Sequence, residues 1–148
     1  MRRLLRHWLK KTSAFVLGVD TNVLVRFFTR DDEVQAEQAR RIITSAQNQP
    51  IRISVIALVE LVWVLTKVKR WSQSEVFAAC SGLLQSDDFV VEEAALVEQS
   101  LIEAQRADCD LADAVIAAMN ARAGCRTTVT FDLDAQALAG MTPAETFS

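Results

Sequence analysis

Short apolar runs alternate with longer helical patterns along this chain, and this alternation constrains the fold more than any other feature. Runs rich in β-branched residues predict strands at 15–19, 51–53, 89–91 and 126–131. Amphipathic or capped segments predict helices at 23–28, 31–46, 55–69, 73–84, 94–106 and 110–123. Strands that are separated by helices pair in parallel, because each connection must cross back over the sheet. We therefore expect an α/β fold with a central parallel sheet flanked by helices.

Capping residues mark several of the helix boundaries. Ser54 precedes a long apolar segment and suits the N-cap position, where its hydroxyl accepts a backbone N–H. Ser72 and Glu75 are three residues apart, which is the spacing of a capping box. Gly124 follows the last predicted helix and suits a left-handed C-cap.

The composition fits one globular domain. With 148 residues, 51% of them hydrophobic, and only 4 Gly and 2 Pro, the chain can form one core and has little room for linkers. We expect a single domain over residues 15–148, preceded by a poorly ordered basic extension over residues 1–14. The longest apolar stretch, 53–65, is interrupted by Glu60 and falls short of the roughly 20 residues that span a bilayer. We therefore expect a cytoplasmic protein without a signal peptide and without membrane association.

Cysteine and histidine usage excludes several kinds of chemistry. The 3 cysteines are an odd number without CxxC spacing, so neither a disulfide framework nor a zinc site is indicated. The single histidine, His7, lies in the basic extension. This position argues against serine or cysteine triads and against histidine-bound metals. Carboxylates are the abundant catalytic groups that remain.

Four carboxylates interrupt apolar segments: Asp20 after FVLGV, Glu60 within VIALVELVWVL, Asp113 before AVIAAM and Asp132 after RTTVTF. Removing a carboxylate from water is costly unless it is paired, protonated or bound to a cation. Several such acids indicate a shared cation, and oxygen ligands without His or Cys favour Mg²⁺ or Mn²⁺. The pattern therefore indicates phosphodiester hydrolysis assisted by one metal ion or by two. Asp20 and Asp132 also end predicted strands, at the edge where parallel sheets bind ligands.

These acids also have structural interpretations. Asp20 can serve as the N-cap of the helix that follows it. Asp110 and Asp113 fall in the first turn of a predicted helix, where a cap and a dipole-stabilising acid are common, and this is the favoured interpretation of Asp110. Asp132 and Asp134 can be turn residues.

The charge distribution bears on nucleic-acid binding. The formal net charge is -3, and the first eleven residues hold five of the 16 Lys and Arg, which leaves 11 bases against 19 acids elsewhere. An acidic body is unusual for a protein that contacts phosphates through Lys and Arg. The candidates for contacts with an RNA backbone lie near the first predicted helix and at the end of the Glu60 helix, where bases also suit the helix dipole. They are Arg26, Arg30, Lys67, Lys69 and Arg70.

Four segments together resemble the PIN-domain family, and within it the VapC-like toxins of prokaryotic toxin–antitoxin pairs. They are VDTNVLVR at 19–26, SVIALVE at 54–60, DLADAVIAA at 110–118 and TFDLD at 130–134, in the family's order and spacing. The resemblance implies a PIN-like fold with a central parallel sheet of four to five strands and an acidic pocket that binds Mg²⁺ or Mn²⁺. It also implies a ribonuclease that leaves a 5′-phosphate and a 3′-hydroxyl.

Matched residue by residue, the resemblance assigns roles to the acids and their neighbours. Asp20, Glu60, Asp113 and Asp132 take the catalytic positions, and the three aspartates among them hold the metal. The supporting positions are filled by Asn22, Ser54, Asp110, Thr130 and Asp134. Family members commonly form homodimers and are silenced by a small VapB-like antitoxin whose tail occupies the site. The first fourteen residues depart from the family pattern, in which the chain begins close to the first strand.

Three alternatives stay open on the sequence. A receiver-like signalling module also has an acidic magnesium pocket, but it needs a phospho-accepting Asp after a middle strand, where this chain has Glu92, and a Lys near the last strand. A PIN-type scaffold could bind RNA or a partner without cutting, although all four acidic positions are filled. A DNA nuclease would use the same carboxylates, and only contacts with the 2′-hydroxyl would distinguish the two substrates.

Overall fold

The computed structural model describes residues 17–148, so the predicted basic extension over residues 1–14 lies outside the described residues. The chain divides into two compact units, of which the first ends at Ala94 and the second comprises Ala95–Ser148. Each unit is described by itself. The expectation of a single domain over residues 15–148 stays a prediction. Among residues 17–148, no helix is both long enough and apolar enough to span a membrane.

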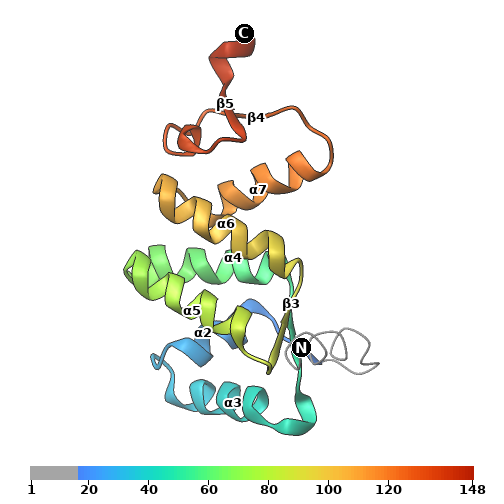
Figure 1. Cartoon of the computed structure of the whole chain (residues 1–148). Helices are drawn as coiled ribbons and strands as arrows, with labels where there is room; N and C mark the ends of the chain where they lie inside the picture. Colours follow the sequence, from blue (N-terminus) through green and yellow to red (C-terminus); the bar gives the residue numbers. More distant parts are fainter. Residues whose placement is uncertain (1–16) are drawn as a thin grey trace. The chain divides into compact units, whose positions relative to one another are not determined.

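The first unit alternates strands and helices in the order expected from the sequence (Figure 1). Its elements are β1 (Leu17–Gly18), α2 (Thr21–Phe28), α3 (Glu33–Thr44), η1 (Ala46–Asn48), β2 (Ile51–Ile53), α4 (Val55–Trp63), η2 (Val64–Val68), α5 (Gln73–Gln85) and β3 (Phe89–Val91). Helix α6 (Ala94–Ala107) begins at the boundary between the units.

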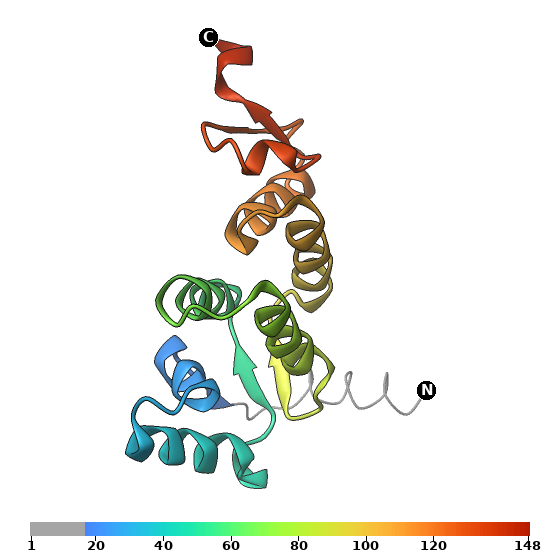
Figure 2. The same ribbon diagram turned by 90° about the vertical axis from the view of Figure 1, so that its left-hand side faces the viewer.

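Strands β1, β2 and β3 form a parallel sheet with β2 in the middle. Figure 2 shows β2 and β3 side by side, where Ile51 pairs with Phe89 and Ile53 with Val91. Ile51 and Ile53 are fully buried, whereas Arg52 between them is exposed, as the pleat of a strand requires. Because the strands are parallel, the helices that follow them begin at one edge of the sheet, at the carboxyl ends of the strands.

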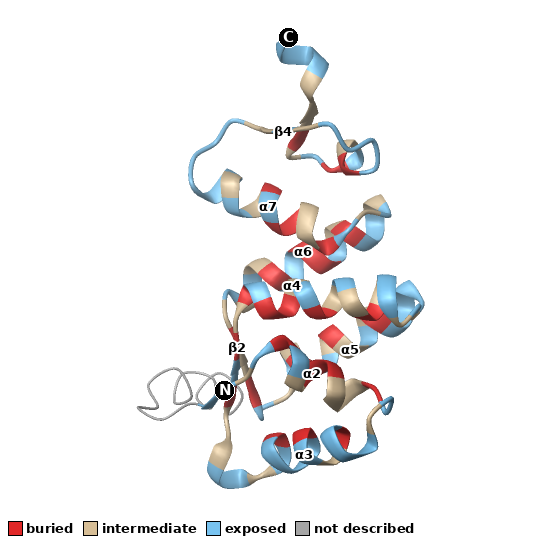
Figure 3. Cartoon of the chain, turned by 180° about the vertical axis from the view of Figure 1, so that it is seen from behind, coloured by how far each residue is buried: buried red, intermediate tan, exposed pale blue. Residues whose placement is uncertain are grey.

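Helices α2 and α3 pack against each other next to this sheet. Helix α3 buries one stripe, formed by Ala36, Ala39 and Ile43, and Figure 3 shows this stripe on the side that faces α2. Phe27 of α2 meets Phe89 of β3 with ring centroids 6.4 Å apart. Apolar burial thus fixes α2, and with it Asp20 at its start, against the sheet.

Ser54 and Glu92 fix the start of α4 at the carboxyl end of β2. Ser54 Oγ accepts the Ala57 N–H at 3.1 Å, which confirms Ser54 as the N-cap. Glu92 follows β3 directly; its Oε1 accepts the Val55 N–H at 3.1 Å and its Oε2 accepts Arg52 Nη2 at 2.6 Å. The Val55 hydrogen bond above all, and then Arg52, hold the pKa of Glu92 below its ordinary value. Two side chains from different segments thus satisfy the first turn of α4.

The second unit forms around a small apolar cluster. Its further elements are α7 (Leu111–Arg122), β4 (Thr128–Thr130), η3 (Ala135–Ala137), β5 (Met141–Pro143) and η4 (Ala144–Phe147). Strands β4 and β5 pair in parallel. The buried members of the cluster are Ala104, Ala114, Ala117, Ala135, Leu138 and Met141. Small residues in this list allow α6, α7 and η3 to approach one another closely.

The expected α/β class with parallel strands is confirmed, and so are several local signals. Ser72 and Glu75 form both hydrogen bonds of the capping box that starts α5. Gly124 ends α7 with a φ of 96°, the left-handed conformation that favours glycine. The sequence therefore predicted these boundaries from hydrogen bonds that side chains and turns supply locally.

Other expectations need correction. The strands among the described residues form two sheets, one of three strands and one of two, instead of a single central sheet. Strand β5 was not predicted, because it ends in Pro143, a residue that usually argues against a strand. The helix predicted over 55–69 is α-helical only through Trp63, after which Lys69 N–H bonds Val64 C=O in a wider π-helical turn. The helix predicted over 31–46 begins only at Glu33, because the Asp32 side chain caps it.

Candidate active site

The four predicted catalytic acids are divided between the two units. Asp20 and Glu60 belong to the first unit, and Asp113 and Asp132 belong to the second. Each pair is supported by contacts within its own unit.

Asp20 and Glu60 are linked through Thr21. Asp20 follows β1 and is the N-cap of α2, with its Oδ1 accepting the Thr21 N–H at 2.7 Å. The Thr21 hydroxyl in turn donates to Glu60 Oε2 at 2.8 Å, although the two residues are 39 positions apart in the sequence. Thr21 is buried at 7% exposure. The next residue, Asn22, which was predicted to support the pocket, is exposed in the first turn of α2.

Glu60 lies on the exposed face of α4. The other face of this helix carries Leu58 and Leu61, which are completely buried. On the exposed face, Glu60 is flanked one turn away by Ile56 and Trp63, which are 73% and 56% exposed. The carboxylate thus has apolar neighbours on its own helix and one polar anchor, the Thr21 hydroxyl, from α2.

Asp113 is at the centre of the acidic residues of the second unit. It lies in the first turn of α7 and is half-buried. Burial raises its pKa first, and the negative charges of Asp132, Asp110 and Asp134 raise it further, in that order. The neighbouring Cys109 has the same acidic surroundings. Its thiol pKa is raised to about 11, first by burial and then by the charges of nearby aspartates. The chain therefore concentrates negative charge at the start of α7.

The side chain of Asp132 organises the backbone that follows it. Its Oδ1 accepts the N–H groups of Asp134 at 2.9 Å and Ala135 at 3.3 Å, which organises the turn into η3. Thr130, a predicted supporting residue, accepts the Asp132 N–H through its hydroxyl at 3.0 Å. Asp132 also acts on Asp113 more strongly than Asp134 does. These contacts favour Asp132 over Asp134 as the fourth acid.

The donor set fits a hard divalent cation by its chemistry. Within residues 17–148, no three Asp, Glu, Cys or His side chains form a group that could hold a metal ion. Within each unit, however, the available donors are carboxylate oxygens, which Mg²⁺ and Mn²⁺ prefer. The charge repulsion at Asp113 is also the kind that a bound cation offsets.

The predicted RNA-binding bases differ in the contacts that they make with nearby acidic and polar side chains. Lys69 forms an ion pair with Asp31, whose pKa is lowered mainly by this hydrogen bond and the Lys69 charge, and also by the charge of Arg26. Arg26 itself donates to the neutral Gln35 side chain at 2.8 Å. Both Lys69 and Arg26 therefore act on the charge of Asp31, near the end of α2. Of the other candidates, Arg30 faces Glu33, whereas Lys67 and Arg70 are exposed in and after η2.

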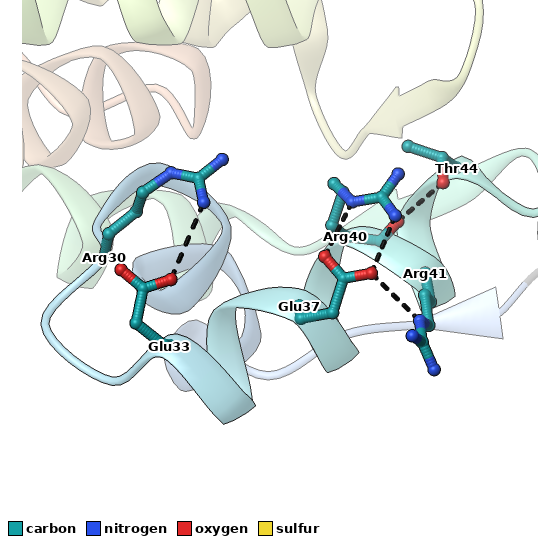
Figure 4. A network of polar contacts seen from close by, with 6 residues as sticks. All are labelled: Arg30, Glu33, Glu37, Arg40, Arg41 and Thr44. Atoms are coloured by element: carbon teal, nitrogen blue, oxygen red, sulfur yellow. Dashed lines mark hydrogen bonds and ion pairs between the residues drawn. The ribbon is translucent and has the colours of Figure 1, made fainter.

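Two arginines of α3 are tied to an acid of their own helix. Figure 4 shows Arg40 and Arg41 converging on Glu37, at 2.8 Å and 3.0 Å. Their hydrogen bonds, from Arg40 first and then Arg41, lower the pKa of Glu37 to about 2. Neither arginine was predicted to contact RNA, and this pairing offers a contrast to Arg26.

Sequence reasoning missed two residues that organise the site. Thr21 was given no role of its own within the segment at 19–26, yet its hydroxyl contacts Glu60. Glu92 was noted only because it follows a strand, yet it joins β3 to α4. A long-range contact between a buried hydroxyl and a carboxylate has no local sequence signal. The position of Glu92 directly after a strand was the one available indication.

Comparison with protein families identifies the fold to which these acids belong. A family model for the PIN domain matches residues 18–141, a span that includes all four acids and parts of both units. No curated protein matches the chain. PIN domains are generally nucleases, and they typically depend on divalent metals. Since the match covers most of its length, the chain belongs to the PIN-domain family.

Proposed function

We propose that this PIN domain is a metal-dependent endoribonuclease that hydrolyses RNA phosphodiester bonds. The observation that carries the proposal is the acidic surroundings of Asp113, whose carboxylate has the negative charges of Asp132, Asp110 and Asp134 nearby. Repulsion between neighbouring carboxylates favours a bound cation that offsets it. Membership in a family of nucleases supports the same conclusion.

Each acid has a proposed task. Asp20, Asp113 and Asp132 would hold Mg²⁺ or Mn²⁺, which would supply Lewis-acid stabilisation of charge on the attacked phosphate. Glu60 accepts a hydrogen bond at Oε2 and uses its other oxygen to orient the attacking water and take up its proton. The supporting residues are Asn22, Ser54, Thr130, Asp110 and Asp134.

The proposed contacts with the RNA backbone come from the bases around α2 and η2. Arg26 and Lys69 supply positive charge near Asp31, and Arg30, Lys67 and Arg70 extend it. Such contacts position an RNA without reading its sequence.

The decisive test is cleavage of a structured RNA with and without Mg²⁺ or Mn²⁺. We expect cleavage that EDTA abolishes and that Asp113→Asn reduces on the order of 100-fold. Asp88→Asn is the matched control, because Asp88 is an exposed aspartate of a turn. Equal cleavage by the parent and Asp113→Asn would exclude the proposal. A DNA strand of the same sequence is a further substrate, and preferential cutting of DNA would replace ribonuclease by deoxyribonuclease.

We further propose that this nuclease is a VapC-like toxin, which acts in the cytoplasm as a homodimer and is silenced by a VapB-like antitoxin. The four motif segments support this subtype, and an acidic site suits an inhibitory segment that carries arginine. Induced synthesis of the parent should arrest bacterial growth, whereas Asp113→Asn should not. Co-expression of the small protein encoded next to it should restore growth, and light scattering should report a dimer. Normal growth during induction of the folded parent would argue against a toxin.

A further inference from the structure

We propose that Thr21 is a positioning residue that fixes the carboxylate of Glu60 for catalysis, an inference that rests on the proposed nuclease function. The Thr21 hydroxyl donates to Glu60 Oε2 at 2.8 Å and joins the first turn of α2 to the exposed face of α4. The Thr21 N–H at the same time donates to Asp20 Oδ1 at 2.7 Å. One residue therefore sets two of the four acids relative to each other.

The side chains of Thr21 and Glu60 differ in conformational freedom, so that the restricted one can hold the mobile one in place. Thr21 is a β-branched residue at 7% exposure in the first turn of a helix, so its hydroxyl direction is tightly restricted. Glu60 is exposed and has a long side chain with several rotatable bonds. Without its hydroxyl, Thr21 would no longer hold the Glu60 carboxylate near Asp20. The carboxylate would then sample many orientations in solvent. A fixed carboxylate is worth more to catalysis than a mobile one.

Thr29 shows what a buried threonine of the same helix does when it has only a structural task. It ends α2 and is also 7% exposed, but its hydroxyl donates to the Val25 carbonyl at 2.8 Å, within its own helix. Local bonding of this kind is common for threonine. Thr21 instead directs its hydroxyl to a carboxylate of another helix. Thr29→Val is therefore a matched control for Thr21→Val.

The kinetic test compares Thr21→Val, Thr21→Ser and Thr29→Val under metal-saturated conditions, with folding checked by circular dichroism and thermal unfolding. We expect Thr21→Val to lower kcat on the order of tenfold while KM for RNA changes little, because the hydroxyl acts on a catalytic group and not on substrate. Thr21→Ser should recover most of the rate, since serine keeps the donor. In a Glu60→Gln background, Thr21→Val should cause almost no further loss, because its effect passes through Glu60.

A second measurement does not depend on activity. Side-chain carbon relaxation of labelled glutamates should show greater mobility of Glu60 in Thr21→Val than in Thr29→Val. Equal mobility in the two variants, or an undiminished effect of Thr21→Val in the Glu60→Gln background, would overturn the positioning role. A parent protein that cleaves no RNA overturns the proposed function alone, and the mobility of Glu60 then still decides whether Thr21 holds its carboxylate.

Discussion

At the scale of single residues, two of the acids have a structural task beside the chemical one that we propose for them. Asp132 organises the turn into η3 through two backbone N–H groups, and its charge acts on Asp113. Asp20 caps α2 in the same way. The structural interpretations of these acids were therefore correct without displacing the chemical ones. Asn is the better inactivating substitution at both positions, because it keeps the hydrogen bonds to backbone N–H groups and removes the charge.

Cys109 provides a residue-scale prediction about the metal. Its pKa is raised to about 11 by burial and by neighbouring aspartates, so little of its reactive thiolate exists near neutral pH. A cation bound among these aspartates would cancel part of their effect and lower the pKa of the thiol. We expect Mg²⁺ to raise the rate of Cys109 alkylation several-fold at constant pH, measured by mass spectrometry of the labelled peptide. Cys125, which is exposed, should react at the same rate with and without metal. An unchanged rate at Cys109 would count against a cation at this place.

At the scale of elements, Glu92 shows how a side chain fixes a helix that carries a proposed catalytic residue. It joins β3 to the first turn of α4, the helix that carries Glu60, and pairs with Arg52 of β2. These contacts of Glu92 also weaken the receiver-like alternative, which would need a phospho-accepting residue at the same strand end.

The order of strands along the chain and the starts of the helices could be predicted, because apolar patterns and caps are local signals. The π-helical turn after Trp63 and the grouping of strands into two sheets could not, because they depend on packing between distant segments.

The pKa of Glu92 gives a prediction about stability and pH. Because its folded pKa lies below its ordinary value of 4.5, Glu92 stabilises the fold fully above that value and loses this contribution as the pH falls through the folded pKa. Glu92→Gln should reduce the free energy of unfolding by about 1 kcal/mol near pH 7, a value already discounted for solvent screening of this partly exposed pair. Urea unfolding should show that the difference shrinks at about pH 3. Glu98→Gln, at an exposed position of α6, should show little difference at either pH. A pH-independent loss in Glu92→Gln would indicate lost packing instead of lost charge.

At the scale of the whole molecule, the chain is acidic, and the proposed ribonuclease would have to bind RNA with few bases. Arg26 bonds a neutral partner, whereas Arg40 is tied to Glu37. Arg26→Gln should weaken RNA binding and lower the slope of log affinity against log salt by about 1, as expected when one phosphate contact is lost. Arg40→Gln should leave both quantities nearly unchanged. Filter binding at several salt concentrations measures the slope, and equal effects of the two substitutions would contradict this difference between the arginines.

Much of the candidate site could be predicted because its residue types are unusual where they stand. A carboxylate such as Glu60 within a long apolar helix is visible in the sequence without any structure. Its anchor, Thr21, was not visible, because a threonine after a strand looks like any capping residue until the fold brings α4 to it. The sequence could not show how far burial and the surrounding charges raise the pKa of Asp113, since both depend on tertiary structure.

The division of the acids along the chain has a consequence for how the protein is made. A ribosome makes the first unit, with Asp20 and Glu60, before it makes Asp113 and Asp132 of the second unit. A nascent or truncated chain that stops at the boundary between the units contains Thr21 and Glu60 and none of the acids around Asp113. A nuclease that needs all four acids would therefore cut no RNA while only its first unit has been made.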